Sequence, residues 1–190
     1  ISRPIRKTNL SKLWWEQVIV PRTAHAVRCS VVHIPYWAPP ALCVVPVVVT
    51  VHDIIPRILP SYRGGPLVRL YTALVSATIE RAAAVLADSE ASRSDIIHHL
   101  RIDPERVHTI PLALPPHYTP EPGLDDERIR NSLGLAEPYV LYLGGFDVRK
   151  NLRAVLSAFG FARRVLPQIR LIVGGRLPES DTAFAPDPRR

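Results

Sequence analysis

The feature that most constrains the fold is an alternation of short apolar runs with helix-like segments. The clearest run is the valine-rich stretch 46–52, which is typical of a parallel strand covered on both faces. Five more runs have the composition of strands: residues 31–34, 84–87, 106–111, 139–143 and 170–174. Amphipathic helical patterns lie around them, at residues 11–27, 67–83, 90–100, 125–133 and 150–166. Strands that alternate with helices form right-handed βαβ units, so the sequence predicts an α/β fold with parallel sheets.

Five prolines within residues 111–122 divide these elements into two sets, because proline disfavours regular structure. We predict four parts: a partial N-terminal Rossmann-like domain (1–114), a Pro-rich connector with a short helix (115–137), the start of a C-terminal Rossmann-like domain (138–176) and a loose tail (177–190). The second set holds a single βαβ unit, which cannot bury both faces of its sheet. The chain also lacks methionine and begins with Ile1. These features predict an internal fragment of a longer protein, with both domains incomplete.

Composition narrows the possible partners. The 24 Lys and Arg residues against 17 Asp and Glu residues give a net charge of +7, which favours phosphate groups or anionic headgroups. The basic residues are spread out and lack interleaved aromatics, so a nucleic-acid partner is not expected. Cys29 and Cys43 lie in apolar surroundings without metal-ligand spacing, which indicates two buried thiols, no metal site and a reducing, cytoplasmic compartment. The longest apolar run, 41–51, is too short to span a bilayer.

Polar residues follow three of the predicted strands directly, at positions 52–53, 88–89 and 144–145. Ligands of open α/β sheets bind beyond the carboxyl ends of the strands, so these positions are candidate site residues. At the third end, Gly144 and Gly145 precede Arg149 and Lys150, which open a predicted helix. Glycine backbone N–H groups, a helix N-terminus and two cations suit a phosphate or diphosphate. The alternative is a structural turn followed by a solvated first helical turn.

Four sequence blocks, in this order and spacing, carry a family resemblance: VVVTVHDIIP (47–56), ADSEASRSDIIHHL (87–100), VHTIPLAL (107–114) and VLYLGGFDVRKNLRAVLSAF (140–159). They resemble a family 4 glycosyltransferase of the GT-B fold. The segments LWWEQVIVP (13–21) and VVHIPYWAPP (31–40) resemble its mannosyltransferase-like branch. The resemblance implies two Rossmann-like domains, of which the N-terminal one takes the acceptor and the C-terminal one the nucleotide-sugar donor. It also implies retention of anomeric configuration without a cofactor or a metal.

The resemblance also assigns roles to single residues. His52 matches the histidine that contacts the donor sugar, where a neutral imidazole can donate to a hydroxyl; the alternative is a strand-end histidine bonded to a neighbouring carbonyl. Asp53 is expected at the cleft, bracing the following loop. Ser89 and Arg93 match a cleft motif, although an N-cap and a solvated helix residue explain them equally well. Lys150 matches the lysine that binds the donor diphosphate, with Arg149 beside it.

The function that follows is transfer of a sugar, with mannose as the expected one. The donor is a nucleotide-diphosphate sugar and the acceptor a glycan or a lipid-linked molecule, with possible peripheral contact with the inner face of the membrane. The family's glycine-rich acceptor loop and its C-terminal pair of glutamates are absent from residues 1–190, so the chain is expected to be inactive alone. A non-catalytic nucleotide- or phosphate-binding module is the alternative.

Overall fold

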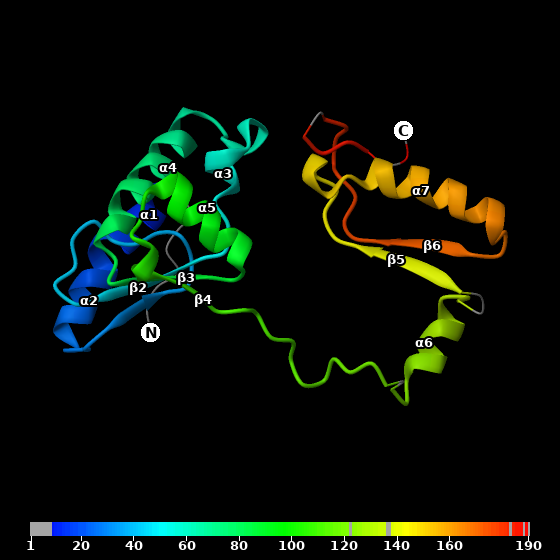
Figure 1. The fold of residues 1–190 in the computed structure, drawn as a ribbon, viewed down its shortest axis with the longest axis horizontal. Helices are drawn as coiled ribbons and strands as arrows, with labels where there is room; N and C mark the ends of the chain where they lie inside the picture. Colours follow the sequence, from blue (N-terminus) through cyan, green and yellow to red (C-terminus); the bar gives the residue numbers. More distant parts are fainter. Residues whose placement is uncertain (1–8, 122, 136–137, 183, 188, 190) are drawn as a thin grey trace. The chain divides into compact units, whose positions relative to one another are not determined.

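The structure, a computed structural model, describes residues 9–121, 123–135, 138–182, 184–187 and 189. The chain divides into two compact units, Ile1–Leu114 and Pro115–Arg190 (Figure 1). Each unit contains a parallel sheet with helical crossovers, which confirms the predicted α/β class. The assignment of the two units to the acceptor and the donor stays a prediction.

The first unit is built on a four-stranded parallel sheet in the order β1-β2-β3-β4. The strands are short: β1 (Val32–Ile34), β2 (Val47–Val51), β3 (Ala84–Ala87) and β4 (Val107–Thr109). The main crossover helices are α4 (Pro66–Thr78), between β2 and β3, and α5 (Glu90–Leu100), between β3 and β4. Four short turns of helix join them: α3 (Ile55–Ile58), η2 (Pro60–Tyr62), η3 (Ile79–Arg81) and η4 (Pro104–Arg106).

The core of this unit lies on one face of the sheet. Val49 and Val51 of β2 pack in one buried cluster with Ile79 and Ile96, which come from the helical segments. Figure 1 shows α4 and α5 on the same side of the sheet, as expected when successive strands are added in one direction by crossovers of one hand. Val48, on the opposite face of β2, is only half-buried. Within the described residues, one face of this strand is therefore fully covered and the other is partly covered.

The N-terminal helical segment differs from the regular helix that its sequence predicts. It consists of α1 (Asn9–Trp14), the π-helical turn η1 (Trp15–Ile19) and α2 (Val20–Ala26). Trp14, expected in the core, is 56% exposed, whereas Glu16 is 2% exposed. A π-helical turn is wider than an α-helical one and rotates the faces of the helix, so the 3.6-residue pattern fails here.

The two cysteines also depart from the prediction. Cys29 and Cys43 are free thiols, but both are half-buried and not fully buried. The Cys29 thiol lies 3.4 Å from the Ala24 carbonyl oxygen and donates to it. Within the described residues no group of three or more histidine, cysteine or acidic side chains could hold a metal ion. None of the described helices combines the length and apolar character that crossing a membrane requires.

The second unit contains two parallel strands and the helix that connects them (Figure 1). Its elements are α6 (Asp126–Ser132), β5 (Tyr139–Leu143), the 3-10 turn η5 (Val148–Lys150), α7 (Leu152–Val165) and β6 (Arg170–Gly174). Asn151 adopts the left-handed conformation, with φ of 47°, and separates η5 from α7. Arg149 and Lys150 therefore precede the helix that they were predicted to open.

The segment after β6 differs from the loose tail expected at 177–190. The backbone N–H of Val148 donates to the Phe184 carbonyl at 2.8 Å. Asp187 is buried and forms an ion pair with Arg189. Part of this segment is therefore fixed against the turn that follows β5.

Candidate functional site

The carboxyl end of the first sheet brings a histidine and an aspartate together. In the register of β2 and β3, Val51 is opposite Ala87, so the next residues on the two strands, His52 and Asp88, are neighbours. His52 Nδ1 lies 2.7 Å from an Asp88 carboxylate oxygen, and His52 Nε2 lies 3.2 Å from the Pro35 carbonyl oxygen. Three strand ends thus hold one imidazole ring.

The partners of this ring determine its protonation. A carbonyl oxygen and a carboxylate can only accept hydrogen bonds, so these two partners favour the protonated ring, in which both nitrogens donate. The hydrogen bond to Asp88 raises the pKa of His52, and the charges of Asp88 and Asp53 and the bond to Pro35 also raise it. Burial opposes them only in part, since the side chain is 54% exposed. The contact of His52 with the Pro35 carbonyl is the one that the alternative describes, and the role of a neutral imidazole against the donor sugar stays a prediction.

Asp53 and Ser89 hold the loops on either side of His52. An Asp53 carboxylate oxygen accepts from the Ile55 backbone N–H at 3.1 Å, which is the predicted bracing contact. The Ser89 hydroxyl is the N-cap of α5 and accepts from the Ser92 N–H at 3.1 Å. Ser92 in turn donates its hydroxyl hydrogen to the His52 carbonyl at 3.0 Å. The start of α5 is therefore tied to the end of β2, which fixes the backbone that carries the histidine.

Arg93, predicted at the cleft, is engaged with the backbone. Its Nε donates to the Val107 carbonyl at 2.8 Å, and one terminal nitrogen donates to the Pro104 carbonyl at 2.9 Å. These bonds join α5 to the start of β4. The structure therefore gives Arg93 a bracing role, and its contact with a substrate stays a prediction.

A buried carboxylate near the site was not predicted from the sequence. Glu16 accepts from the Tyr71 hydroxyl, with O–O distances of 3.0 and 3.2 Å, and Lys12 Nζ lies 3.6 Å from the same carboxylate. Burial, followed by the charge of Glu16 and a hydrogen bond to it, raises the pKa of Tyr36 to about 12. Because Tyr36 directly follows Pro35, this cluster positions the loop whose carbonyl holds His52.

Gln17, the neighbour of Glu16, fixes the same loop from its other side. Its amide oxygen accepts from the Ala41 N–H at 2.7 Å, and its amide nitrogen lies 3.3 Å from the Pro39 carbonyl. The only sequence signal for this arrangement was the pair of polar residues inside an otherwise apolar helical segment. The sequence also did not indicate Asp88 as a partner of His52. Asp88 directly follows β3, just as His52 directly follows β2.

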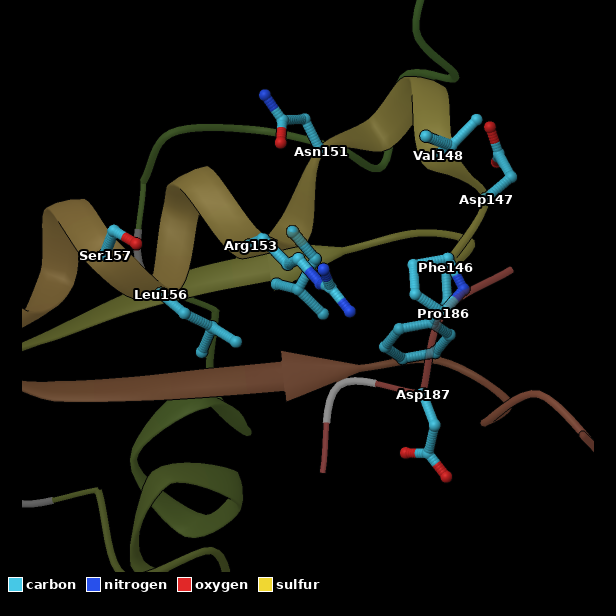
Figure 2. Close-up of a pocket in the computed structure, with 10 residues that line it drawn as sticks. Phe146, Asp147, Val148, Asn151, Arg153, Leu156, Ser157, Pro186 and Asp187 are labelled. Carbon is cyan, nitrogen blue, oxygen red and sulfur yellow. The ribbon is translucent and has the colours of Figure 1, made fainter. Parts of the chain in front are cut away.

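The second unit has a cavity of about 380 Å³ beside the glycine turn (Figure 2). Figure 2 shows its lining along the turn after β5, on the first turns of α7 and at Pro186 and Asp187. The lining residues within the described chain are Phe146, Asp147, Val148, Asn151, Leu152, Arg153, Leu156, Ser157, Pro186 and Asp187. The predicted phosphate ligands Gly144, Gly145, Arg149 and Lys150 are not among them. Their role in binding the donor therefore stays a prediction.

A close backbone approach lies beside the glycine turn, at Gly175. Gly144 has φ of 152°, and Gly175, which follows β6, has φ of 146°. A Cβ atom added to Gly175 would lie 2.4 Å from the Gly144 carbonyl oxygen, closer than real Cβ atoms approach. Arg149 Nε lies 3.8 Å from an Asp147 oxygen, so an acidic side chain shares the charge of this turn. The backbone geometry thus requires glycine at Gly175 whether or not a phosphate binds.

Comparison with known proteins identifies the family. The model of the family described as Glycosyltransferase Family 4 matches residues 2–117, which is more than half of the chain. The chain therefore belongs to this family. It is 31% identical over 113 residues to O-antigen chain mannosyltransferase B of Escherichia coli. That match covers 59% of this chain and 30% of the relative, so the chain spans less than a third of the relative's length.

A solved structure is also similar to the chain. The crystal structure of a glycosyltransferase from Rickettsia africae ESF-5 matches 92% of this chain and 54% of its own, with a TM-score of 0.47 and 11% identity. The family predicted from the four sequence blocks is confirmed by the family match.

Proposed function

We propose that the protein is a retaining glycosyltransferase that moves mannose from a nucleotide-diphosphate sugar to a glycan or a lipid-linked acceptor. The family match over residues 2–117 is the observation that carries this proposal. The similarity to a mannosyltransferase supports the choice of sugar. A cytoplasmic location, with contact at the inner face of a membrane, belongs to the same proposal.

In this proposal His52 contributes positive charge when its ring is protonated, a state that the hydrogen bond to Asp88 favours by raising the pKa of His52. An imidazolium held by Asp88 and more than half exposed can stabilise negative charge that develops on the departing diphosphate. The bond from Nε2 to Pro35, at 3.2 Å, is the longer of the two, so a substrate oxygen can replace the carbonyl there. Asp88 keeps the ring in place while that exchange occurs.

The donor diphosphate is assigned to Gly144, Gly145, Arg149 and Lys150. The turn supplies backbone N–H groups and two adjacent cations, which suit phosphate oxygens. Both cationic side chains lie on the exposed turn η5. The proposal requires no cofactor and no metal ion, because these groups can offset the charge of the leaving group.

Titration of the chain with GDP-mannose tests the assignment of the donor site. Lys150→Ala should raise the dissociation constant roughly tenfold, as expected for loss of a charge-assisted contact. Arg163→Ala, on the exposed surface of α7, is the matched control and should leave the constant unchanged. An unchanged constant in the Lys150 variant would remove this residue from the site.

A transfer assay separates catalysis from binding alone. Protein expressed from the complete coding region is incubated with the donor and a lipid-linked acceptor, and labelled mannose in the acceptor is measured. Transfer supports the enzyme assignment. Donor binding without transfer, in a preparation that includes the complete coding region, would favour the nucleotide-binding module.

A further inference from the structure

A second hollow, of about 410 Å³, lies in the first unit at the surface formed by α3 and α4. Its described lining residues are Pro56, Arg57, Arg63, Arg69, Thr72 and Ala73. Arg57 comes from α3, Arg63 follows η2 and Arg69 lies near the start of α4. Three guanidinium groups from three successive elements therefore surround one depression.

The charges of these arginines are not balanced locally. The sequence from residue 54 to residue 79 contains three arginines, no lysine and no acidic residue. Within the described chain, no carboxylate forms an ion pair with Arg57, Arg63 or Arg69. Arg69 donates its Nε hydrogen to the Gly64 carbonyl at 3.2 Å, which orients the guanidinium. The N–H groups on its two terminal nitrogens can still donate to a ligand.

The surroundings add positive charge. Arg57 and Ala73 also line a neighbouring hollow of about 650 Å³, where Arg101, His98 and His99 are present and Glu80 is the one acidic side chain in the described lining. Helix α4 begins beside Arg63 without a side-chain N-cap and without an acidic residue in its first turn. The dipole of α4 is therefore not offset by an acidic side chain in its first turn.

We propose that Arg57, Arg63 and Arg69 form a binding site for a phosphate ester. The planar guanidinium presents paired donors that match phosphate oxygens, and three such groups around one hollow suit a doubly charged or bridged phosphate. The residues are separate from those assigned to the donor, so the site does not depend on the proposed transfer reaction.

Two sources can supply this chemistry: a soluble phosphate ester, or the headgroup of an anionic lipid. The helix that carries Arg69 also exposes Leu67 and Leu70, which are 74% and 69% exposed. Exposed apolar side chains on a helix that also carries a cation are typical of a surface that meets a lipid headgroup and its acyl chains. The experiment below distinguishes the two sources.

The first arm measures phosphate binding with inorganic pyrophosphate as the probe. Titration calorimetry uses the whole chain carrying Lys150→Ala, so that the assigned donor site does not contribute. Arg63→Gln combined with Arg69→Gln should weaken binding by about tenfold or more. Arg22→Gln combined with Arg163→Gln removes the same charge from exposed positions elsewhere and should have little effect. Equal weakening in both double variants, or no weakening in either, would overturn the site.

The second arm identifies the source. The chain is sedimented with vesicles of phosphatidylcholine alone or mixed with phosphatidylglycerol. The site is assigned to a lipid headgroup if the chain is retained on the anionic vesicles under two conditions. Retention must be lost in the Arg63/Arg69 variant, and it must be reduced by Leu67→Ser combined with Leu70→Ser. Pyrophosphate binding without such retention assigns it to a soluble ester. Far-ultraviolet circular dichroism, which reports on both units, checks that each variant is folded; all the substituted residues are exposed.

Discussion

Replacement of Glu16 tests how the first unit holds the loop beside His52. The carboxylate is 2% exposed, and the Tyr71 hydroxyl donates to its two oxygens at 3.0 and 3.2 Å. Lys12 lies 3.6 Å away, with a side chain that is itself exposed. The charge of Glu16 is therefore stabilised mainly by tyrosine hydroxyls, and removal of that charge should be measurable as a loss of stability.

The magnitude follows from the contacts. Glu16→Gln keeps the shape but turns charge-assisted hydrogen bonds into neutral ones, which costs about 1–2 kcal/mol. The ion pair with exposed Lys12 adds less than about 1 kcal/mol because water screens it. Glu16→Ala also leaves the Tyr71 hydroxyl without its acceptor and opens a void, so its cost should reach about 2–4 kcal/mol.

Urea unfolding followed by tryptophan fluorescence is the assay. All three tryptophans, at positions 14, 15 and 37, lie in the first unit, so the signal reports on that unit alone. A double-mutant cycle with Tyr71→Phe should give a coupling free energy of about 1 kcal/mol or more. Additive losses for Glu16→Gln and Tyr71→Phe would refute the reasoning, because they would show that the two groups do not interact.

The same substitution should change the dependence of stability on alkaline pH. The pKa of Tyr36 is raised from 10.0 to about 12, by burial first and then by Glu16, and the pKa of Tyr71 is raised for the same reasons. The folded state holds the Tyr36 hydroxyl in its neutral form more strongly than the unfolded state does. This contribution to stability is complete below pH 10 and is lost as the pH rises towards 12. Glu16→Gln should make this loss shallower, and ultraviolet absorbance of the phenolates should show the lower pKa values directly.

Two further predictions concern the strand ends. Asp88→Asn should lower the pKa of His52, which an NMR titration of the ring measures. The raised pKa of His52 stabilises the fold fully below pH 6.5, and this contribution is lost as the pH rises through the folded-state pKa. The variant should therefore lose stability mainly at acidic pH. An unchanged His52 titration would contradict the pairing. Gly175→Ala should destabilise the second unit by about 1–3 kcal/mol in urea unfolding, because the new Cβ would meet the Gly144 carbonyl. The control is Gly160→Ala on α7, where the Cβ would meet open space; this change should be neutral or stabilising. Equal effects of the two alanines would show that the strand ends are not in close approach.

The sequence predicted the strands well because each is a short apolar run between polar or turn residues. It also placed His52 correctly at a strand end, since that required only the end of the valine run. The contacts of its ring could not be predicted, because Asp88 and Pro35 follow two other strands. Pairing across a sheet is set by register, and no local pattern of the chain contains it.

Two departures have local causes that periodicity cannot reveal. Glu16 is buried because η1 widens the helix, whereas the sequence predicts a regular helix. The sequence predicts a helix from Lys150, but α7 begins at Leu152 because Asn151 is left-handed. Asparagine adopts this conformation more often than most residues do, but its presence alone does not predict it. The contact of Phe184 with Val148 joins residues far apart in the chain, so nothing near Phe184 indicated it.

The widened turn η1 has a consequence for how this segment can change by insertion and deletion. A π-helical turn holds one residue more than an α-helical turn, so removing one residue from Trp15–Ile19 would convert η1 to a regular α-helix. The turns on either side would keep nearly their present orientation. A single-residue deletion in η1 that keeps Glu16 and Gln17 should therefore be less harmful than one in the regular helix α2, which would rotate the residues beyond it by about 100°.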